Sequence, residues 1–498
     1  MKLFKYVPAA IILSVTFNQA PAADEENDVR TPDIKSQTEI ENQLMELAVA
    51  NFDSNYYRQL LRLHKSKESG NYPTELAISY LMIRNFREKI PVYSWAEKQH
   101  LSFPKENTEF LVEDVEKYND LIASGNIWNE LVGMRPNVPS YLVFRTEIQK
   151  QMKSLAASEE PYTFRLIKPG FSGPQIDIIK KVMIAGGYLD ENCPLDGYYD
   201  LELTEAMKKF QSDNGLKPDG IIGEMTYDLL FKNSSSKAVS LARSLIRMSD
   251  NDLYSNAEYV FVNIPSLNMH VISDSKNIME SKVIVGRNDR QTPTLKSQIN
   301  NVVLNPVWTA PSTISQKDYL PKIRADRYYL AKKGLNLYMG SEKVDPSTLT
   351  PDDLTKSGFR KYRITQAPGA KNAMGQYKFN FPNSESVYLH STNSPSGFNK
   401  SLRTLSSGCV RVQKSNELAK YLLRNEMKPE RIDKIVASGK TFGIPLSSNV
   451  PVYIAYWTSY IDGDGKFVYL PDIYNLDRKA EKLPLDLINL YNQENENL

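Results

Sequence analysis

The strongest constraint on the fold of this chain is a change of sequence pattern near residue 255. Before it, apolar residues recur at helical spacing, beginning with Leu44, Leu47 and Ala48 and continuing to about residue 155. After it, short runs rich in valine, isoleucine and aromatic residues alternate with turn residues, at 259–264, 269–272, 282–286, 301–308 and 377–381. Helices that precede strands, rather than alternate with them, predict an α+β multidomain protein.

The length of 498 residues is more than one hydrophobic core usually serves, and it predicts about three domains. The first expected parts are a signal peptide at 1–22, a helical scaffold at 23–158 and a three-helix unit at 159–235, followed by a serine-rich linker at 233–237. A β-rich domain at 255–446 comes next, with a helical capping insertion at about 315–365. The last part is a C-terminal hairpin and tail at 447–498, which we expect to pack on the β-rich domain.

Residues 1–22 have the composition of a secretory signal peptide. Lys2 and Lys5 precede an apolar stretch at 7–17, and Ala20-Pro21-Ala22 offers small residues for cleavage. The apolar stretch is shorter than the roughly 20 residues of a spanning helix, and no later segment is long and apolar enough to cross a bilayer. We therefore expect an exported, soluble protein of the periplasm or cell surface.

Charge and cysteine content narrow the function classes. The formal net charge of +2, with acidic and basic residues well mixed, argues against nucleic acid or an anionic membrane as a partner. Exported proteins usually pair their cysteines, but Cys193 and Cys409 fall in different expected domains. We expect Cys193 to be a small buried apolar residue and Cys409 to be a free thiol kept for chemistry.

Cys409 and a nearby histidine form the candidate catalytic pair. Cys409 lies in Ser406-Ser407-Gly408-Cys409-Val410-Arg411, and His390 precedes it across a turn-rich loop at 393–400. If two strands return side by side there, His390 can take the thiol proton while amides of the turn at 407–409 hold an oxyanion. From the residues alone, a structural cysteine near an unrelated histidine stays an alternative. A zinc site is disfavoured because no third or fourth soft ligand lies near Cys409 at finger or ribbon spacing.

The same segment resembles the signature of the L,D-transpeptidases, which have a YkuD-type catalytic domain. The motif is His390, fifteen intervening residues and then the string from Ser406 to Arg411. Further strings that match are Asn305-Pro306-Val307-Trp308, Gln366-Ala367-Pro368-Gly369, Asn372-Ala373-Met374-Gly375, Lys378-Phe379-Asn380-Phe381-Pro382-Asn383 and Val387-Tyr388-Leu389-His390. Upstream, Phe210-Gln211, Gly215-Leu216, Asp219-Gly220-Ile221-Ile222-Gly223 and Thr226 resemble the small three-helix peptidoglycan-binding domain. The combination is similar to the large periplasmic branch of the family.

This resemblance implies a reaction and the residues that perform it. Cys409 would attack the carbonyl of the third residue of a peptidoglycan stem tetrapeptide, expel D-alanine and pass the acyl group to a neighbouring stem as a 3–3 crosslink, with His390 as the proton carrier. The turn residues Ser407 and Gly408, with the amides of Gly408 and Cys409, would form the oxyanion site. Substrate-binding candidates are Tyr388, Trp308, Arg411, Asn305 and Ser406. The implied partners are stem peptides and cell-wall synthesis proteins, with no nucleic acid, metal or cofactor.

Two positions depart from the family pattern. The often quoted form of the motif has a second histidine where Ser407 stands, although serine there is typical of the larger branch. Ser391 follows His390 where an acidic residue is common in that branch. We therefore expect a backbone carbonyl or a hydroxyl, not a carboxylate, to orient the histidine.

Other functions stay open at this stage. Transfer to water would make the protein a carboxypeptidase that trims stems, and a papain-like endopeptidase would also use a Cys–His pair. In that second class the cysteine usually precedes the histidine and opens a helix, whereas here His390 comes first and Cys409 precedes strand-like residues. A non-catalytic wall-binding protein is the remaining alternative.

Overall fold

The computed structural model describes residues 29–50, 54–68, 70–93, 112–153, 166–185, 188–190, 192–213, 216–230, 234–249 and 253–477. The expected signal peptide at 1–22 lies outside these residues. Among the helices in the described ranges, none is long and apolar enough to cross a membrane.

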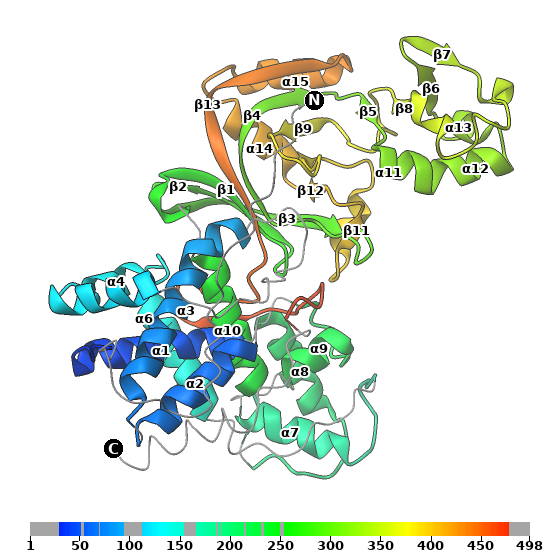
Figure 1. Ribbon diagram of the computed structural model, residues 1–498. Helices are drawn as coiled ribbons and strands as arrows, with labels where there is room; N and C mark the ends of the chain where they lie inside the picture. The colour runs from blue at the N-terminus through cyan, green and yellow to red at the C-terminus, as the bar shows by residue number, and fades with distance from the viewer. Residues whose placement is uncertain are drawn as a thin grey trace, which may run out of the picture.

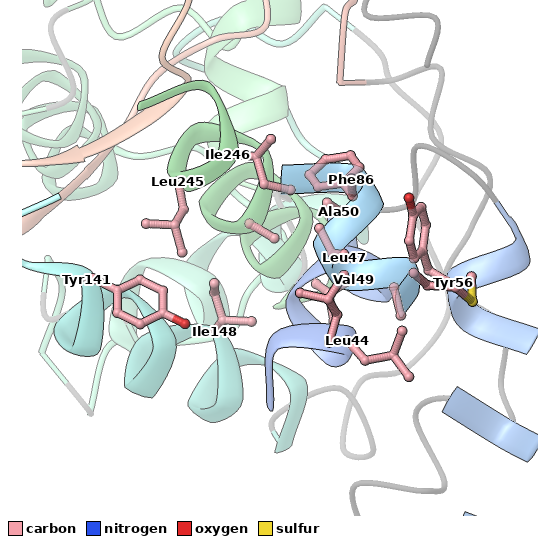
Figure 2. Close-up of a cluster of buried hydrophobic side chains, with 14 of the residues drawn as sticks. Leu44, Leu47, Val49, Ala50, Tyr56, Phe86, Tyr141, Ile148, Leu245 and Ile246 are labelled. Carbon is pink, nitrogen blue, oxygen red and sulfur yellow. The ribbon is translucent and has the colours of Figure 1, made fainter. Parts of the chain in front are cut away.

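The N-terminal part is a bundle of helices around one apolar core. Its helices are α1 (Ile34–Ala50), α2 (Ser54–Ser66), α3 (Tyr72–Tyr93), α4 (Val112–Ala123), α5 (Ile127–Gly133) and α6 (Tyr141–Lys153). A later helix, α10 (Ser234–Met248), packs against α1 and α6 and completes the bundle. Figure 2 shows Leu245 and Ile246 of α10 in the cluster that also holds Leu44, Leu47 and Ile148.

The serine-rich linker expected at 233–237 is wrong. The helix α10 begins inside this run, at Ser234, and its residues Ala238, Leu241 and Leu245 are fully buried. Burial of this apolar face against α1 and α6 outweighs the low intrinsic helix preference of serine, which is worth only tenths of a kcal/mol to about 0.7 kcal/mol per residue.

A small three-helix unit follows the bundle in the chain. It consists of α7 (Gln175–Ala185), α8 (Leu201–Asp213) and α9 (Glu224–Leu230), and β-bridges join Ile167 to Ile222 and Ser172 to Tyr198. Cys193 lies in its apolar core with 7% of its surface exposed, and both cysteines of the chain are free. The expectation of a buried apolar Cys193 is confirmed.

The β-rich part is built on one nine-stranded sheet with the order β11-β3-β12-β10-β9-β4-β13-β1-β2. An additional pairing of β2 with β3 makes the sheet curl back on itself. The strands are β1 (Glu258–Asn263), β2 (Asn268–Ser273), β3 (Lys276–Gly286), β4 (Leu295–Leu304), β9 (Tyr377–Asn380), β10 (Leu389–His390), β11 (Thr404–Ser406), β12 (Val410–Val412) and β13 (Phe442–Ala455). The helices α14 (Ser415–Leu422) and α15 (Pro429–Ser438) bury Leu418 and Ile432 in the same core (Figure 1).

The insertion between β4 and β9 has its own core and is not only helical as expected. Its helices are α11 (Ser312–Ile314), the π-helix η3 (Ser315–Tyr319), α12 (Leu320–Ala325) and α13 (Tyr329–Lys332). It also holds a four-stranded sheet of β5 (Trp308–Thr309), β8 (Tyr362–Gln366), β6 (Asn336–Met339) and β7 (Glu342–Val344). Figure 1 shows this insertion projecting from one end of the main sheet. The strands are two to five residues long, which left too short a pattern to recognise.

The C-terminal residues belong to two different parts of the molecule. The expected boundary between 446 and 447 falls inside β13, which pairs with β1 and β4 in the main sheet. The hairpin of β14 (Ser459–Ile461) and β15 (Phe467–Tyr469) packs on the helical bundle, where the rings of Phe467 and Phe144 are 5.3 Å apart. The expectation that the hairpin packs on the β-rich part is therefore wrong, because its apolar side chains complete the bundle core.

Ser244 of α10 connects this hairpin to the bundle, and we predict that Ser244→Ala destabilises the protein. The buried Ser244 Oγ accepts hydrogen bonds from the amides of Thr458 at 3.1 Å and Ser459 at 3.0 Å. The alanine variant leaves both buried N–H groups without this acceptor, which costs about 2–4 kcal/mol. The measurement is the free energy of unfolding in urea. The exposed Ser212→Ala on α8 is the control and should stay within about 0.5 kcal/mol; equal stability of the two variants would contradict the assignment.

Candidate active site

Parallel strands bring the two candidate catalytic residues to one place. Strand β10 pairs with β12 in the register Leu389 to Val410 and His390 to Arg411, and the amide of Val410 donates to the carbonyl of Tyr388 at 3.2 Å. Cys409 is the residue before β12, so it comes level with the start of β10. Cys409 and His390 line the same cavity, whose volume is about 300 Å³.

The turn that carries Cys409 is fixed by side chains from inside and outside the motif. Gly408 has a φ of +118°, a conformation that glycine adopts without strain. The hydroxyl of Ser406 donates to the carbonyl of Cys409 at 2.6 Å, and Thr292 Oγ1 donates to the carbonyl of Gly408 at 2.8 Å. The turn therefore holds the thiol on a rigid backbone.

The amides of this turn differ in their availability. The Gly408 amide donates a hydrogen bond to Ser406 Oγ at 3.1 Å, so this amide is already occupied within the turn. The amides of Ser407 and Cys409 have no such bond among the hydrogen bonds of the described residues. Of the donors expected for an oxyanion, Cys409 and Ser407 are thus better placed than Gly408, because a donor must be open to the developing charge.

His390 is a buried base between two cations. Its side chain is almost fully buried, with 6% of the residue exposed, and its neighbours in the sheet register are Lys378 on β9 and Arg411 on β12. Burial lowers the pKa of His390 to about 3, and the charge of Arg411, then that of Lys378, adds to the effect. His390 is therefore a neutral imidazole near pH 7 and is able to accept a proton.

The groups that favour protonated His390 belong to the backbone. The polar backbone groups of Met374 and Ser391 partly oppose this fall in the pKa of His390. The Ser391 hydroxyl is used elsewhere: it donates to the Met374 carbonyl at 2.9 Å and accepts from the amides of Gln376 and Tyr377. The Ser391 hydroxyl is therefore not the orienting group. The buried Nδ1 of His390 has no hydrogen-bond partner among the described residues, so a backbone carbonyl as its orienting group stays a prediction.

The charges of Lys378 and Arg411 also act on the pKa of the Cys409 thiol, where they oppose the effect of burial. Burial raises the pKa of Cys409, while hydrogen bonding with Tyr388 and the charges of Lys378 and Arg411 oppose the rise. Lys378 Nζ lies 4.3 Å from the ring centroid of Tyr388, which in turn packs 5.7 Å from the imidazole of His390. The thiol and the imidazole are therefore both neutral near pH 7, and the positive charges of Lys378 and Arg411 favour the thiolate form of Cys409.

The other sequence-predicted residues divide into two groups. Tyr388, Trp308, Arg411, Ser406 and Ser407 all line the cavity with the catalytic pair. Trp308 is 7% exposed and packs on the insertion, and Ser406 is a buried support of the turn. Arg411 is partly exposed, and its buried Nε has no partner among the described residues.

Asn305 is the exception, and its expected role in binding substrate is wrong. Its side-chain amide donates to the carbonyls of Ile435 at 2.9 Å, Val436 at 3.1 Å and Lys440 at 3.2 Å, at the C-terminal end of α15. Its backbone φ is +48° and the residue is 4% exposed. Asn305 is thus a structural residue that caps carbonyl groups at a helix end.

A salt bridge that the sequence did not indicate connects the turn at 406–409, which carries Cys409, to the insertion. Arg290 binds Asp318 of η3 with both terminal nitrogens, at 2.6 and 2.5 Å, and its Nη1 also donates to the Ser407 hydroxyl at 3.2 Å. No motif marks Arg290, since it lies in a loop between β3 and β4 and far from Asp318 in sequence. Lys378 stood in a matched string, but only the strand register shows that it flanks His390.

Comparisons with known proteins agree with this geometry. Residues 257–454 match the family model described as the L,D-transpeptidase catalytic domain (YkuD), and residues 172–230 match the "putative peptidoglycan binding domain".

A "putative L,D-transpeptidase" of Haemophilus influenzae is 41% identical over 238 residues, which cover 47% of this chain and 48% of that protein. The N-acetylmuramoyl-L-alanine amidase CwlL of Bacillus licheniformis is 33% identical over 98 residues, or 20% of this chain and 27% of that protein. The chain therefore spans about half or less of the length of these relatives.

A solved structure gives a weaker likeness. The L,D-transpeptidase of Xylanimonas cellulosilytica is 14% identical to this chain, with a TM-score of 0.19, over 59% of this chain and 100% of that one.

Gly375 shapes the segment that leads to His390, and we predict that Gly375→Ala lowers both stability and activity. Gly375 has a φ of +64°, and an added Cβ would lie 2.2 Å from Ser391 Oγ and 2.7 Å from the amide of Thr392. Strain and displacement of Ser391 together cost at least about 2 kcal/mol in urea unfolding. The control is Gly340→Ala, where φ is +59° but nothing lies within 4 Å of the new Cβ, so only about 1–2 kcal/mol of strain is expected. A Gly375 variant no less stable than this control would contradict the prediction.

The buried His390 should make the protein less stable in acid. Its pKa of about 3 in the folded protein lies below the ordinary value of 6.5, so the unfolded chain binds the proton first as pH falls. The free energy of unfolding is therefore unaffected by His390 above about pH 6.5, and below that pH it falls by up to about 1.4 kcal/mol per pH unit. His390→Gln, which cannot titrate, should show a flatter dependence of unfolding free energy between pH 7 and pH 5. Parallel curves for the two proteins would show that His390 is not held neutral.

Proposed function

We propose that this protein forms 3–3 crosslinks in peptidoglycan through a thioester at Cys409, because residues 257–454 match the L,D-transpeptidase catalytic domain and residues 172–230 match a peptidoglycan-binding domain. The observation that carries the proposal is the pairing of β10 with β12, which puts Cys409 and His390 on one cavity of about 300 Å³. Each step below assigns a role to a residue of that cavity.

The first half-reaction is acylation of the thiol. His390 accepts the proton of Cys409 while the sulfur attacks the carbonyl carbon of the third residue of a stem tetrapeptide. The charge that develops on the carbonyl oxygen is met by the amides of Cys409 and Ser407. Collapse of this intermediate breaks the bond to the terminal D-alanine nitrogen, His390 returns the proton to that nitrogen, and free D-alanine leaves the thioester behind.

The cations beside the pair have two roles in this step. Lys378 and Arg411 stabilise the negative charge that develops on the sulfur as His390 takes its proton, as the direction of their effects on the pKa of Cys409 indicates. Arg411 lines the cavity, and its Nε lacks a partner among the described residues, which suits it to the carboxylate of the D-alanine that leaves. Tyr388 and Trp308 form the apolar walls along the peptide.

The second half-reaction decides between crosslinking and trimming. An amine of a neighbouring stem attacks the thioester carbonyl and gives a proton to His390; the C–S bond breaks, a new amide forms, and the proton passes to the released Cys409 thiolate. Attack by water instead releases a shortened stem. Trp308, Pro311 and Ile314 of the insertion line the cavity, and the Arg290–Asp318 salt bridge holds the insertion against the nucleophile turn. An apolar cover that limits water supports the amine as the acceptor.

The alternatives are less consistent with the site. A papain-like endopeptidase would carry its cysteine at the start of a helix, whereas Cys409 leads into β12. A wall-binding protein without activity would not need a buried neutral histidine beside a thiol. The two matched domains act on peptidoglycan, so an extracytoplasmic location follows; the periplasm, reached through the signal peptide at 1–22, and cell-wall synthesis proteins as partners belong to the proposal.

Replacement of Cys409 tests the reaction directly. Purified protein is incubated with a disaccharide-tetrapeptide, and the products are identified by mass. We expect crosslinked dimers and free D-alanine from the native protein, and a loss of at least about 1000-fold in Cys409→Ala, since the covalent route is gone. Cys193→Ala is the matched control, because the second cysteine is buried in the three-helix unit, and it should keep full activity.

A carbapenem gives an independent readout of the same thiol. We expect one adduct per chain, on Cys409, in the native protein and in Cys193→Ala, and none in Cys409→Ala. Shortened stems without dimers would show that trimming dominates, and cleavage of existing crosslinks would show an endopeptidase. Turnover that survives in Cys409→Ala would overturn the thioester mechanism.

A further inference from the structure

A second cavity lies in the helical bundle. Its volume is about 350 Å³, and its lining includes three arginines, Arg84 and Arg87 of α3 and Arg135 after α5. Two acidic residues, Glu88 and Glu130, also line it. Arg84 and Arg87 are three residues apart and so share one face of α3. Nothing in the matched family models covers these residues, since the models begin at 172 and 257.

Beneath the cavity, charged side chains form a buried network. Glu39 binds Arg135 at 2.9 and 2.7 Å and Arg145 at 2.8 and 3.0 Å, so both of its oxygens are shared by two guanidinium groups. Glu46 accepts from Arg145 Nε and from the hydroxyl of Tyr141, each at 2.7 Å. Burial raises the pKa of Glu39, but the hydrogen bonds from Arg145 and Arg135 and the charge of Arg145 outweigh it and lower this pKa to about 2.

The network has more positive than negative charge. It contains the three guanidinium groups of Arg87, Arg135 and Arg145 and only the two carboxylates of Glu39 and Glu46. Buried ions are costly unless each has a counterion, because the interior solvates them poorly. One positive charge of this network therefore lacks a counterion within it.

The uncompensated charge falls on Arg87. Its side chain is 7% exposed, and its one ion pair is a long contact of 3.5 Å from Nη2 to Glu46. Glu46 is already engaged by Arg145 and Tyr141, and the Nε and Nη1 of Arg87 have no hydrogen-bond partner among the described residues. The Arg87 side chain therefore lines the cavity and has two buried N–H donors without a partner among the described residues.

Among the described residues, no ion pair joins Arg87 to Glu88 or Glu130, the two acidic residues of the lining. Glu88 is bound by Arg84 Nε at 2.9 Å and its side chain is 62% exposed. Arg135 is occupied by Glu39 and lies over the ring of Trp128, 5.4 Å from its centroid. A neutral molecule could accept hydrogen bonds from Arg87 but would not balance its charge.

We propose that this cavity, centred on Arg87, binds a small oxyanion of the carboxylate or phosphate class. Each unpartnered N–H group of the Arg87 guanidinium can donate to an oxygen of such an anion, and a charge-assisted hydrogen bond gains in strength where water is excluded. Arg84 and Arg135 at the mouth add positive charge that attracts the ligand. The site is separate from Cys409, so it gives the helical bundle a binding role of its own.

Thermal unfolding of the full chain tests this site. The probes are sodium phosphate and sodium acetate, each compared with sodium chloride at the same ionic strength so that screening is equal. A ligand that binds only the folded protein raises the melting temperature as its concentration exceeds the dissociation constant. We expect phosphate or acetate to raise the melting temperature of the native protein progressively, and to leave that of Arg87→Met unchanged relative to chloride. A response to acetate alone would assign a carboxylate ligand, and a response to phosphate alone would assign a phosphate.

Arg62→Met is the matched control, because Arg62 is an exposed arginine of α2 and the net charge changes by the same amount. This variant should respond to the anions as the native protein does. Carbapenem acylation of Cys409, measured by mass, reports whether each variant is folded and should be equal in all three proteins. An equal anion response in Arg87→Met and Arg62→Met, or no response in the native protein, would overturn the proposal. Crystals grown with selenate provide a direct view, and we expect the selenium anomalous peak beside Arg87.

Discussion

The parallel pairing of β10 with β12 is the interaction on which the candidate active site depends. Each strand is only two or three residues long, so neither could hold its position alone. They are fixed by their neighbours, because β9 pairs with β10, β3 pairs with β12, and Thr292 binds the turn between. The position of one thiol is thus set by a sheet whose strands come from residues 276 to 412.

The same sheet also sets the electrostatics of the pair. Lys378 and Arg411 flank His390 because they occupy the register positions on either side of it. Their charges lower the pKa of His390 and oppose the rise in the pKa of Cys409. In the proposed mechanism, two cations therefore stand where a conventional triad has a carboxylate: they would not stabilise an imidazolium, but they would stabilise a thiolate at Cys409.

The sequence was informative where the chemistry is local. Cys409, His390 and the glycine between Ser407 and Cys409 lie in one short motif, and the loop before it predicted that two strands return side by side. Asn305 was misassigned because its amide is used by the end of α15, more than a hundred residues away. The pairing of Arg290 with Asp318 and the packing of the 459–469 hairpin on the bundle are likewise contacts between distant segments, which no local pattern encodes.

Buried arginines illustrate why partners, rather than burial, identify a binding site. Arg403 is 8% exposed and lies beside another cavity, yet it makes four hydrogen bonds to carbonyls, those of Val283, Lys400, Ser401 and Leu267. Its donors are used by the fold, so it is a structural residue. Arg411 and Arg87 each line a cavity and keep buried donors without a partner among the described residues. An unused buried donor costs about 1–3 kcal/mol, and the anions proposed for these two cavities would remove that cost.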